Sequence, residues 1–521
     1  MVQEACAHAL ADGMDHPMVK RIGSLRGGGH AHEDLMGMFR KETGAVDAIE
    51  RVRAGGADEA AKYILLPSKV LSALGTFYPE QHRLRLGADT GKVRAFWRQF
   101  LKQPSNQDFQ ASHPLLAGLT VAQLGRYIPL AIHEDAGPIS KGKSATIVSW
   151  ASLLATGSEK FTHFPAGTWV KEREADRLPL SHVWGQLLDD FESLARGSGA
   201  SSTSADSWKY ILLFAKGDEE CRSNEWGLKH YNDAAECCPD CFADRQDAPF
   251  TDLQSSAAWR IGGDLSVDDF INRIRQPMHP LAASQFMWRC FFYMDYMHCL
   301  DCKGLSAVMF GSLASTLLRC PSIGRTKGQR FNTLNAFCTE WYDAHPGNSR
   351  LPRLRETNIV NLGWAELSAP DIKAANTRHA APLFAAMAAR FCDPAGEQDA
   401  LMLKATSLLV GLYTTLKESG MFFKPGELAR FSEVCLGLAE TLQSLRALSE
   451  SRGFFAWQIK PKANRFCHFP LYAGTINPRV VSCYADESHI GTCCAAWKKS
   501  LKGRWQKDSA VTVAAAASAA H

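Results

Sequence analysis

The 521-residue sequence contains no run of about 18 apolar residues, the length that a membrane-spanning helix usually needs. Residues 1–21 also lack the apolar core of a secretory signal peptide. We therefore expect a soluble intracellular protein without a membrane partner. Neither sign of charge dominates, because 58 basic residues against 54 acidic ones leave a net charge of +4. That excess is too small to establish a nucleic-acid partner, although basic residues are dense at 452–465 and 498–507.

Cysteine is not scarce, since the chain has 16 of them. Without a secretory signal we expect these thiols to stay reduced, with some of them binding metal. Hydrophobic residues make up 46% of the sequence, which is enough to bury a large core divided among two or three structural units.

Two aspartates follow short apolar runs that end at glycine, the pattern of buried strands. Asp135 follows the run that begins at Tyr127, and Asp218 follows the run that begins at Tyr210. Carboxylates that leave neighbouring core strands are held rigidly and can bind divalent metal between them, as in a phosphodiester-cutting site. The alternative is that each aspartate only caps a turn, and Glu219 and Glu220 compete with Asp218 as ligands.

The order of the expected elements indicates a fold class. We predict strands at 127–133, 145–154, 162–170 and 208–215, and an amphipathic helix at 181–196 between the third and fourth strands. This is the order of a ribonuclease-H-like core, with acids ending the first and fourth strands. From about 265 the signals are helical, including a long apolar helix over 286–318 and helices at 400–417 and 426–450. The predicted fold is α/β plus α, with a mixed-sheet core and a large α-helical insertion.

A cysteine-rich stretch downstream of Asp218 suggests structural zinc. Cys238 and Cys241 form a Cys-x-x-Cys pair, and Cys221 and His230 precede them at distances that allow a four-ligand thiolate–imidazole site. The alternative is a set of buried, reduced cysteines. A second pair, Cys299 and Cys302, has no partner pair nearby, and we interpret it as packing.

Asp295 and His298 stand three residues apart, so they share one face of the expected helix. They can form an accessory ligand pair or a hydrogen-bonded pair, and the alternative is a histidine satisfied within the core.

The C-terminal tract holds a third candidate acid and several basic residues. Asp486 and Glu487 begin an expected helix whose later turns are basic. One interpretation is charge that complements the helix dipole; the other is a third catalytic carboxylate followed by turns that contact the phosphate backbone. The residues that we predict to contact DNA are Lys460, Lys462, Arg479, Lys498, Lys499, Lys502 and Arg504.

Taken in order, these motifs resemble the catalytic domain of eukaryotic cut-and-paste DNA transposases of the broad hAT, CACTA and Mutator-like group. Five segments are also similar to a multicopy family of algal proteins derived from such elements. The resemblance covers about residues 110–507. The five segments are residues 132–138 (IHEDAGP), 298–304 (HCLDCKG), 460–462 (KPK), 477–479 (NPR) and 484–491 (YADESHIG).

The resemblance implies a nuclear protein that cleaves and transfers DNA strands with Asp135, Asp218 and Glu487 bound to Mg²⁺ or Mn²⁺. It leaves open whether Asp486 rather than Glu487 is the third acid, and Asn464 stands where the pattern has a histidine. DNA is the expected partner, and self-association is left open. An inactive relic and a non-catalytic DNA- or chromatin-binding protein are the alternative functions, and an unrelated α-rich protein is the alternative fold.

These expectations divide the chain into five parts. They are an N-terminal helical or flexible region (1–110), the first part of the core with the zinc-binding loop (111–262), a helical region that includes the insertion (263–455), the C-terminal part of the core (456–507) and a disordered tail (508–521).

Overall fold

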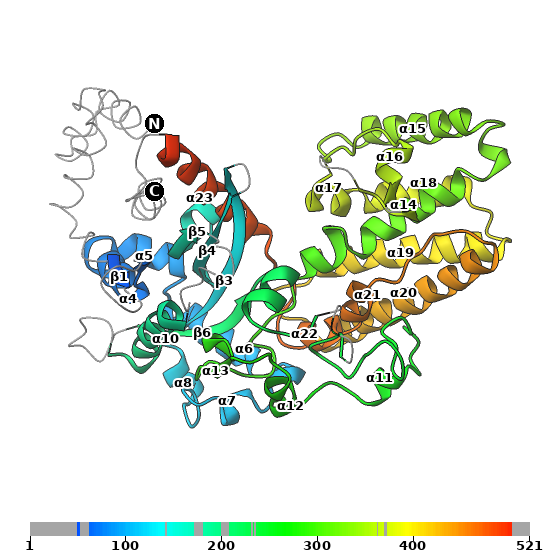
Figure 1. Cartoon of the computed structure of the whole chain (residues 1–521). Helices are drawn as coiled ribbons and strands as arrows, with labels where there is room; N and C mark the ends of the chain where they lie inside the picture. Colours follow the sequence, from blue (N-terminus) through cyan, green and yellow to red (C-terminus); the bar gives the residue numbers. More distant parts are fainter. Residues whose placement is uncertain are drawn as a thin grey trace.

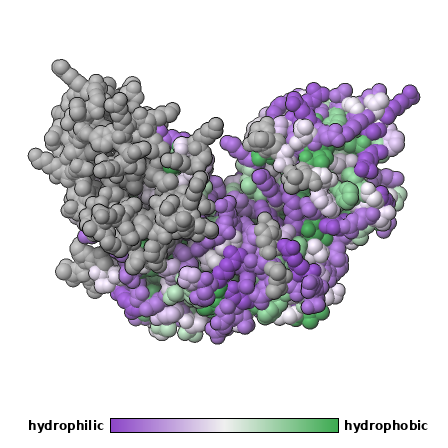
Figure 2. Space-filling model, viewed as in Figure 1, coloured by the Kyte–Doolittle hydropathy of each residue, from purple (hydrophilic) through white to green (hydrophobic). Residues whose placement is uncertain are grey.

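A mixed β-sheet and an extensive helical region make up the protein, as the computed structural model in Figure 1 shows. The structure describes residues 49–52, 62–140, 143–170, 181–198, 208–230, 233, 236–361, 363–368 and 372–502. The sheet lies on the left of Figure 1, the long helices lie on the right, and α21 and α22 lie between them. Figure 2 shows the same view as a surface, in which a notch separates the two parts and its described surface is mostly hydrophilic.

The sheet has six strands in the order β1-β2-β5-β4-β3-β6. Strand β3 is central: it runs antiparallel to β4 on one side and parallel to β6 on the other. The parallel pair requires a crossover, and helix α10 (Ser181–Arg196) lies within that connection and packs on β6. The strands are β1 (Ile49–Val52), β2 (Lys62–Leu65), β3 (Tyr127–Ser140), β4 (Lys143–Ser152), β5 (His163–Val170) and β6 (Lys209–Lys216).

Helices cover both faces of the sheet. Because alternate residues of a strand point to opposite faces, Ile132 and Asp135 of β3 face opposite ways. Trp150 of β4 pairs with Ile132, and on that face its ring meets Phe191 of α10. On the Asp135 face, a small apolar cluster joins the sheet to α23 (Tyr484–Lys502). That cluster consists of Ile139, Ala145, Ile147, Ile490, Cys493 and Cys494.

Short helices precede the central strand and follow β6. The former are α4 (Pro67–Phe77), α5 (Pro79–Leu86), α6 (Thr90–Phe100), α7 (Phe109–Ser112) and α8 (Val121–Leu124); α9 (Glu159–Thr162) precedes β5. The latter are the π-helical turn η4 (Cys221–Glu225), α11 (Ala258–Ile261), α12 (Val267–Asn272) and α13 (Pro280–Ala283).

The helical region lies between Asp218 and α23 in sequence. Its longest elements, α19 (Glu397–Glu418) and α20 (Pro425–Ser451), pack against each other, and α18 (Ala381–Phe391) packs on α19. The rest comprises η5 (Met297–Asp301), α14 (Leu305–Leu317), η6 (Pro321–Ile323), α15 (Lys327–Ala344), α16 (Glu356–Ile359), β7 (Val360–Asn361), β8 (Trp364–Ala365), α17 (Ala374–His379), α21 (Pro461–Phe466) and α22 (Phe469–Ala473).

Most of the predicted elements are confirmed. Apart from the end of β3, the four core strands, α10 and the two long helices lie within a few residues of their predicted bounds. The chain is mixed α/β with many helices, so the α-rich alternative is wrong. Most of residues 1–60 and the expected tail 508–521 lie outside the described residues.

Two local predictions are wrong. Residues 286–318 do not form one helix, because a π-helical turn and Gly304 separate the irregular segment from α14. Gly304 passes so close to Cys299 that an added Cβ would meet the carbonyl oxygen at 2.2 Å. Asp135 does not end its strand either, because β3 continues to Ser140 in its pairing with β4. Among the described helices, none is long and apolar enough to cross a membrane.

Gly137 fixes how closely α23 approaches β3. A Cβ at this position would lie 2.3 Å from the Cys494 sulfur and 3.1 Å from an Ile490 methyl carbon, so the helix would have to move. We predict that Gly137→Ala lowers the free energy of unfolding by about 1–3 kcal/mol. Gly491→Ala in the same helix meets nothing within 4 Å and should raise it by about 0.5–1 kcal/mol. Chemical denaturation of the two variants measures both changes, and an equal effect of both would contradict the tight approach.

Candidate functional site

Asp135 and Asp218 come together at the end of the β3–β6 pairing. The last register pair of these parallel strands is His133 with Lys216, and each aspartate lies two residues further along its chain. The two carboxylates therefore leave neighbouring strands in the same direction. Both also accept a local hydrogen bond: Asp135 from Ala136 N at 2.6 Å and Asp218 from Cys221 N at 2.7 Å. Asp218 thus has the predicted turn-capping role, whereas Asp135 lies within β3 and its bond to the next amide caps no turn.

Helix α23 carries Glu487 to the same place. Its neighbour Asp486 is buried and forms an ion pair with Lys216 of β6 at 2.6 Å, and it lies 3.3 Å from His163 Nε2 of β5. Burial raises the pKa of Asp486, but the opposing effect of Lys216 and the histidines is larger, so the net pKa lies well below its usual value. Asp486 is therefore committed to holding α23 on the sheet. Of the two adjacent acids, Glu487 is the one near Asp135.

The three acids act on one another electrostatically. Burial raises the pKa of Asp135 most, the charges of Asp218 and Glu487 raise it further, and a hydrogen bond to Glu487 adds to the effect. The net pKa is about 9. Without a cation, Asp135 is thus protonated at neutral pH. A cluster of carboxylates that repel one another in this way is suited to oxygen-binding divalent cations.

His298 connects the acid cluster to a buried aspartate. Its Nδ1 lies 2.7 Å from Asp295 Oδ2, and its Nε2 lies 3.7 Å from Glu487 Oε1. Burial lowers the pKa of His298, but hydrogen bonds to Asp295 and Cys302 outweigh it, so the net pKa is well above the usual value. Asp295 Oδ1 also accepts from Cys483 N at 2.9 Å, just before α23. The Asp-x-x-His sequence is thus a hydrogen-bonded pair that reaches Glu487.

A pocket opens beside these residues. Besides Gly217, Asp295 and His298, its lining includes the cationic side chains of Lys462 and Arg465 from α21. Lys462 Nζ donates to Cys302 O at 2.9 Å, and burial lowers the pKa of Lys462. Arg465 is paired with Glu219.

The other residues predicted to contact DNA have varied positions. Lys460 is half-buried and forms an ion pair at 2.6 Å with the buried Glu366, so its charge is engaged within the protein. Arg479 and Lys498 are exposed. Arg504 and the side chains of Lys499 and Lys502 lie outside the described residues.

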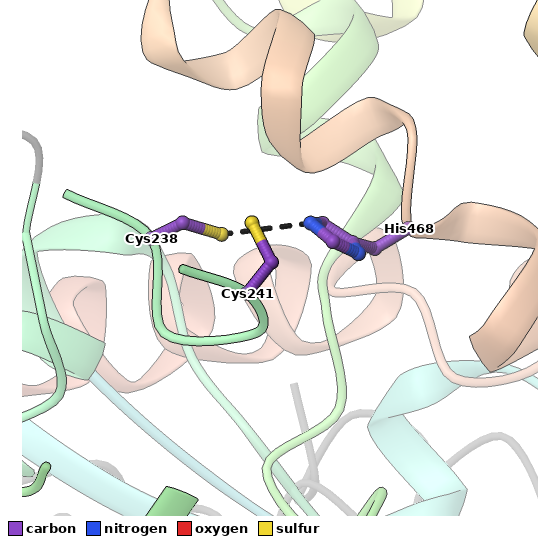
Figure 3. Close-up of side chains that lie close together, drawn as sticks. All are labelled: Cys238, Cys241 and His468. Carbon is purple, nitrogen blue, oxygen red and sulfur yellow. Dashed lines mark hydrogen bonds between the residues drawn. The ribbon is translucent and has the colours of Figure 1, made fainter. Parts of the chain in front are cut away.

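A second cluster brings the Cys-x-x-Cys pair to a histidine from the other end of the chain. One ligand atom from each of Cys238, Cys241 and His468 lies within 4.8 Å of the others, and all three residues are buried. Figure 3 shows the two sulfurs and the imidazole ring turned toward one another. Cys238 Sγ and His468 Nε2 are 3.6 Å apart.

This arrangement retains two of the four predicted zinc ligands, Cys238 and Cys241, and replaces the other two. Cys221 lies elsewhere, with its sulfur 3.9 Å from Glu134 Oε2 and its backbone amide bonded to Asp218. His230 is half-buried, and its backbone amide donates to Asp233 Oδ2 at 2.8 Å. Sequence proximity suggested these two residues, whereas the fold supplies His468, which lies 227 residues beyond Cys241. The only sequence signal for it was the Cys467-His468-Phe469-Pro470 motif.

Two other groups of candidate ligands have structural roles. His133, Cys483 and Asp486 lie close enough together to bind a metal ion, but Asp486 already pairs with Lys216. Cys299 is buried and donates from its sulfur to Lys462 O at 3.2 Å, in line with the predicted packing role. Cys302 is less buried, and the hydrogen bond from His298 lowers its pKa.

Comparison with known proteins supplies no family. No family model matches the chain, and no curated protein matches it. Function therefore has to be inferred from the two clusters themselves.

Loss of either partner of the buried Lys216–Asp486 ion pair should strongly destabilise the site. Both side chains are more than nine-tenths buried, so removing one partner leaves an uncompensated charge. We predict that Lys216→Met lowers the free energy of unfolding by about 3–5 kcal/mol, and that Asp486→Leu in the same chain recovers part of this loss. Chemical denaturation of both single variants and the double variant measures the coupling; strictly additive losses would show that the pair does not hold α23.

Asp135 should make the metal-free protein less stable as pH rises. Its folded pKa of about 9 exceeds its unfolded value of about 3.9, so its contribution is full below pH 4 and is lost as pH rises toward 9. We predict that Asp135→Asn raises the melting temperature at pH 8 by about 2 °C or more, with a smaller gain at pH 5. Added Mg²⁺ should stabilise the unsubstituted protein and not the variant. The exposed Asp343→Asn serves as control and should show neither effect.

Proposed function

We propose that this protein cleaves and transfers DNA strands as a transposase-like enzyme, with Asp135, Asp218 and Glu487 as its catalytic acids. One observation carries the proposal: three carboxylates, distant in sequence, converge from β3, the end of β6 and α23 so closely that two of them raise the pKa of the third. Repulsion between such close carboxylates destabilises the folded protein unless a cation binds there.

The fold is consistent with this chemistry. The four core strands lie in the order β5-β4-β3-β6, with the antiparallel strands before the crossover helix and the parallel strand after it. This is the arrangement expected of a ribonuclease-H-like core. The helical region lies between the second and third acids in sequence, as in the transposases that the sequence resembles.

Each acid has a distinct supporting contact. Asp218 is fixed by the Cys221 amide, Asp135 by the Ala136 amide, and Glu487 by the docking of α23 and by His298. Mg²⁺ or Mn²⁺ bound by these acids would activate water or a 3′-hydroxyl and stabilise the leaving oxygen. Asp295 keeps His298 protonated beside Glu487, so we assign His298 to positioning this third acid.

The cationic groups near the acids suit a phosphodiester substrate. Lys462 lines the pocket beside Asp295 and His298, and its pKa responds to the charge of Asp218. A phosphate of the DNA backbone placed at the acids would therefore lie near the Lys462 ammonium group, which donates to the Cys302 backbone carbonyl. DNA as the substrate implies a nuclear protein.

Strand cleavage by the purified full chain tests the proposal. With Mn²⁺ or Mg²⁺, we predict nicking of supercoiled plasmid that falls at least about 100-fold in each of Asp135→Asn, Asp218→Asn and Glu487→Gln, because loss of one acid disrupts metal binding in the site. Glu220→Gln, an exposed neighbour of Asp218, should retain activity.

The outcomes separate the alternatives. Metal-dependent nicking activity that co-purifies with the chain and survives in both aspartate variants would overturn the assignment of the acids. DNA binding without any nicking by the unsubstituted chain would instead favour a non-catalytic DNA- or chromatin-binding protein that retains a transposase-like fold.

A further inference from the structure

We propose that Cys238, Cys241 and His468 bind one structural zinc ion that ties the loop after β6 to the turn between α21 and α22. The inference does not depend on DNA cleavage, because metal content reports it directly.

The spacing of the three side chains matches tetrahedral zinc. Zinc–sulfur bonds of about 2.3 Å and zinc–nitrogen bonds of about 2.05 Å at the tetrahedral angle place a sulfur and a nitrogen ligand about 3.6 Å apart. Cys238 Sγ and His468 Nε2 are 3.6 Å apart. The third ligand atom, on Cys241, lies within 4.8 Å of both, a limit that includes the separation of about 3.8 Å that two zinc-bound thiolates would have.

Each of the three ligands has a hydrogen-bond partner that suits a metal-bound state. Cys238 Sγ accepts from Asp240 N at 3.4 Å, and Cys241 Sγ accepts from Ala243 N at 3.4 Å. Backbone amides that point at the two sulfurs from two residues downstream stabilise negative charge on thiolates. On the far side of the ring, His468 Nδ1 lies 3.0 Å from Asp264 Oδ1, an interaction that orients the ring with Nε2 toward the sulfurs.

Neighbouring cysteines are directed elsewhere, which limits the site to these residues. Cys237 Sγ donates to Ala243 O at 3.3 Å, and Cys467 Sγ donates to Ala463 O at 3.2 Å. We therefore assign the fourth position to a water molecule. All three ligands are buried, which limits access of a substrate to the ion, so we assign the ion a structural role.

A zinc ion here would connect the segment that follows Asp218 to the segment that precedes Glu487 in sequence. Cys238 and Cys241 lie in the connection that follows Asp218, whereas His468 lies between α21, which carries Lys462 and Arg465, and the helix that carries Glu487. The closed loop spans the whole helical region, and long loops gain most from such a link. Zinc would therefore maintain the relative placement of the second acid, the pocket cations and the third acid.

Metal analysis of the full chain, purified without chelator, tests the site. The unsubstituted protein should contain about one zinc ion per chain, and its cobalt-substituted form should show the absorption of tetrahedral cobalt with thiolate ligands. Cys238→Ser and His468→Ala should each lose at least about ten-fold in zinc affinity, with a lower melting temperature. If these variants do not fold, release of zinc from the unsubstituted chain on modification of two thiols still tests the assignment.

Matched neighbours serve as controls. Cys237→Ser, Cys467→Ser, Cys221→Ser and His230→Asn should all retain zinc. Absence of zinc with a Cys238–Cys241 disulfide would overturn the inference, and so would zinc that persists in His468→Ala. Loss of zinc in Cys467→Ser would overturn the assignment of water to the fourth position. Nicking activity decides none of these outcomes, so failure of the zinc site and failure of the proposed function remain distinguishable.

Discussion

The site depends on the buried ion pair between Lys216 and Asp486. Lys216 is the last residue of β6, and Asp486 lies in the first turn of α23, 270 residues later. An ion pair in such a buried place is weak as a source of net stability but strongly specifies geometry, since either charge alone would be severely destabilising. It sets which residue of the helix faces β3, and the next residue, Glu487, thereby meets Asp135. Gly137 lets the same helix pack closely on the strand.

At both the acid cluster and the cysteine–histidine cluster, buried side chains bring together segments that are distant in the sequence. Asp295 bonds to the backbone of Cys483 and to His298, so it links the start of the helical region to the start of α23. The Cys238–Cys241–His468 cluster brings the connection after β6 to the start of α22. The large helical region can therefore lie between the second and third acids without separating them in space.

Local patterns in the sequence predicted the elements well. The bounds of α10 match the predicted 181–196, and the apolar runs ending in Asp135 and Asp218 do pair as neighbouring strands. The sequence favoured Glu487 as the third acid but left Asp486 open, because adjacent acids at a helix start look alike until their partners are known. No role is predicted from the sequence for Lys216 or His468. Both have roles set by contacts across more than 200 residues, which no local pattern encodes.

Direct measurement of divalent cations at the acid cluster tests the account most sharply. Titration of the full chain with Mn²⁺, followed by electron paramagnetic resonance, should reveal two ions per chain with magnetic coupling, which two ions about 4 Å apart would show. Glu487→Gln should abolish the coupling, whereas Glu220→Gln should preserve it. Mn²⁺ binding that is unchanged after substitution of Asp135, Asp218 and Glu487 together would contradict the account.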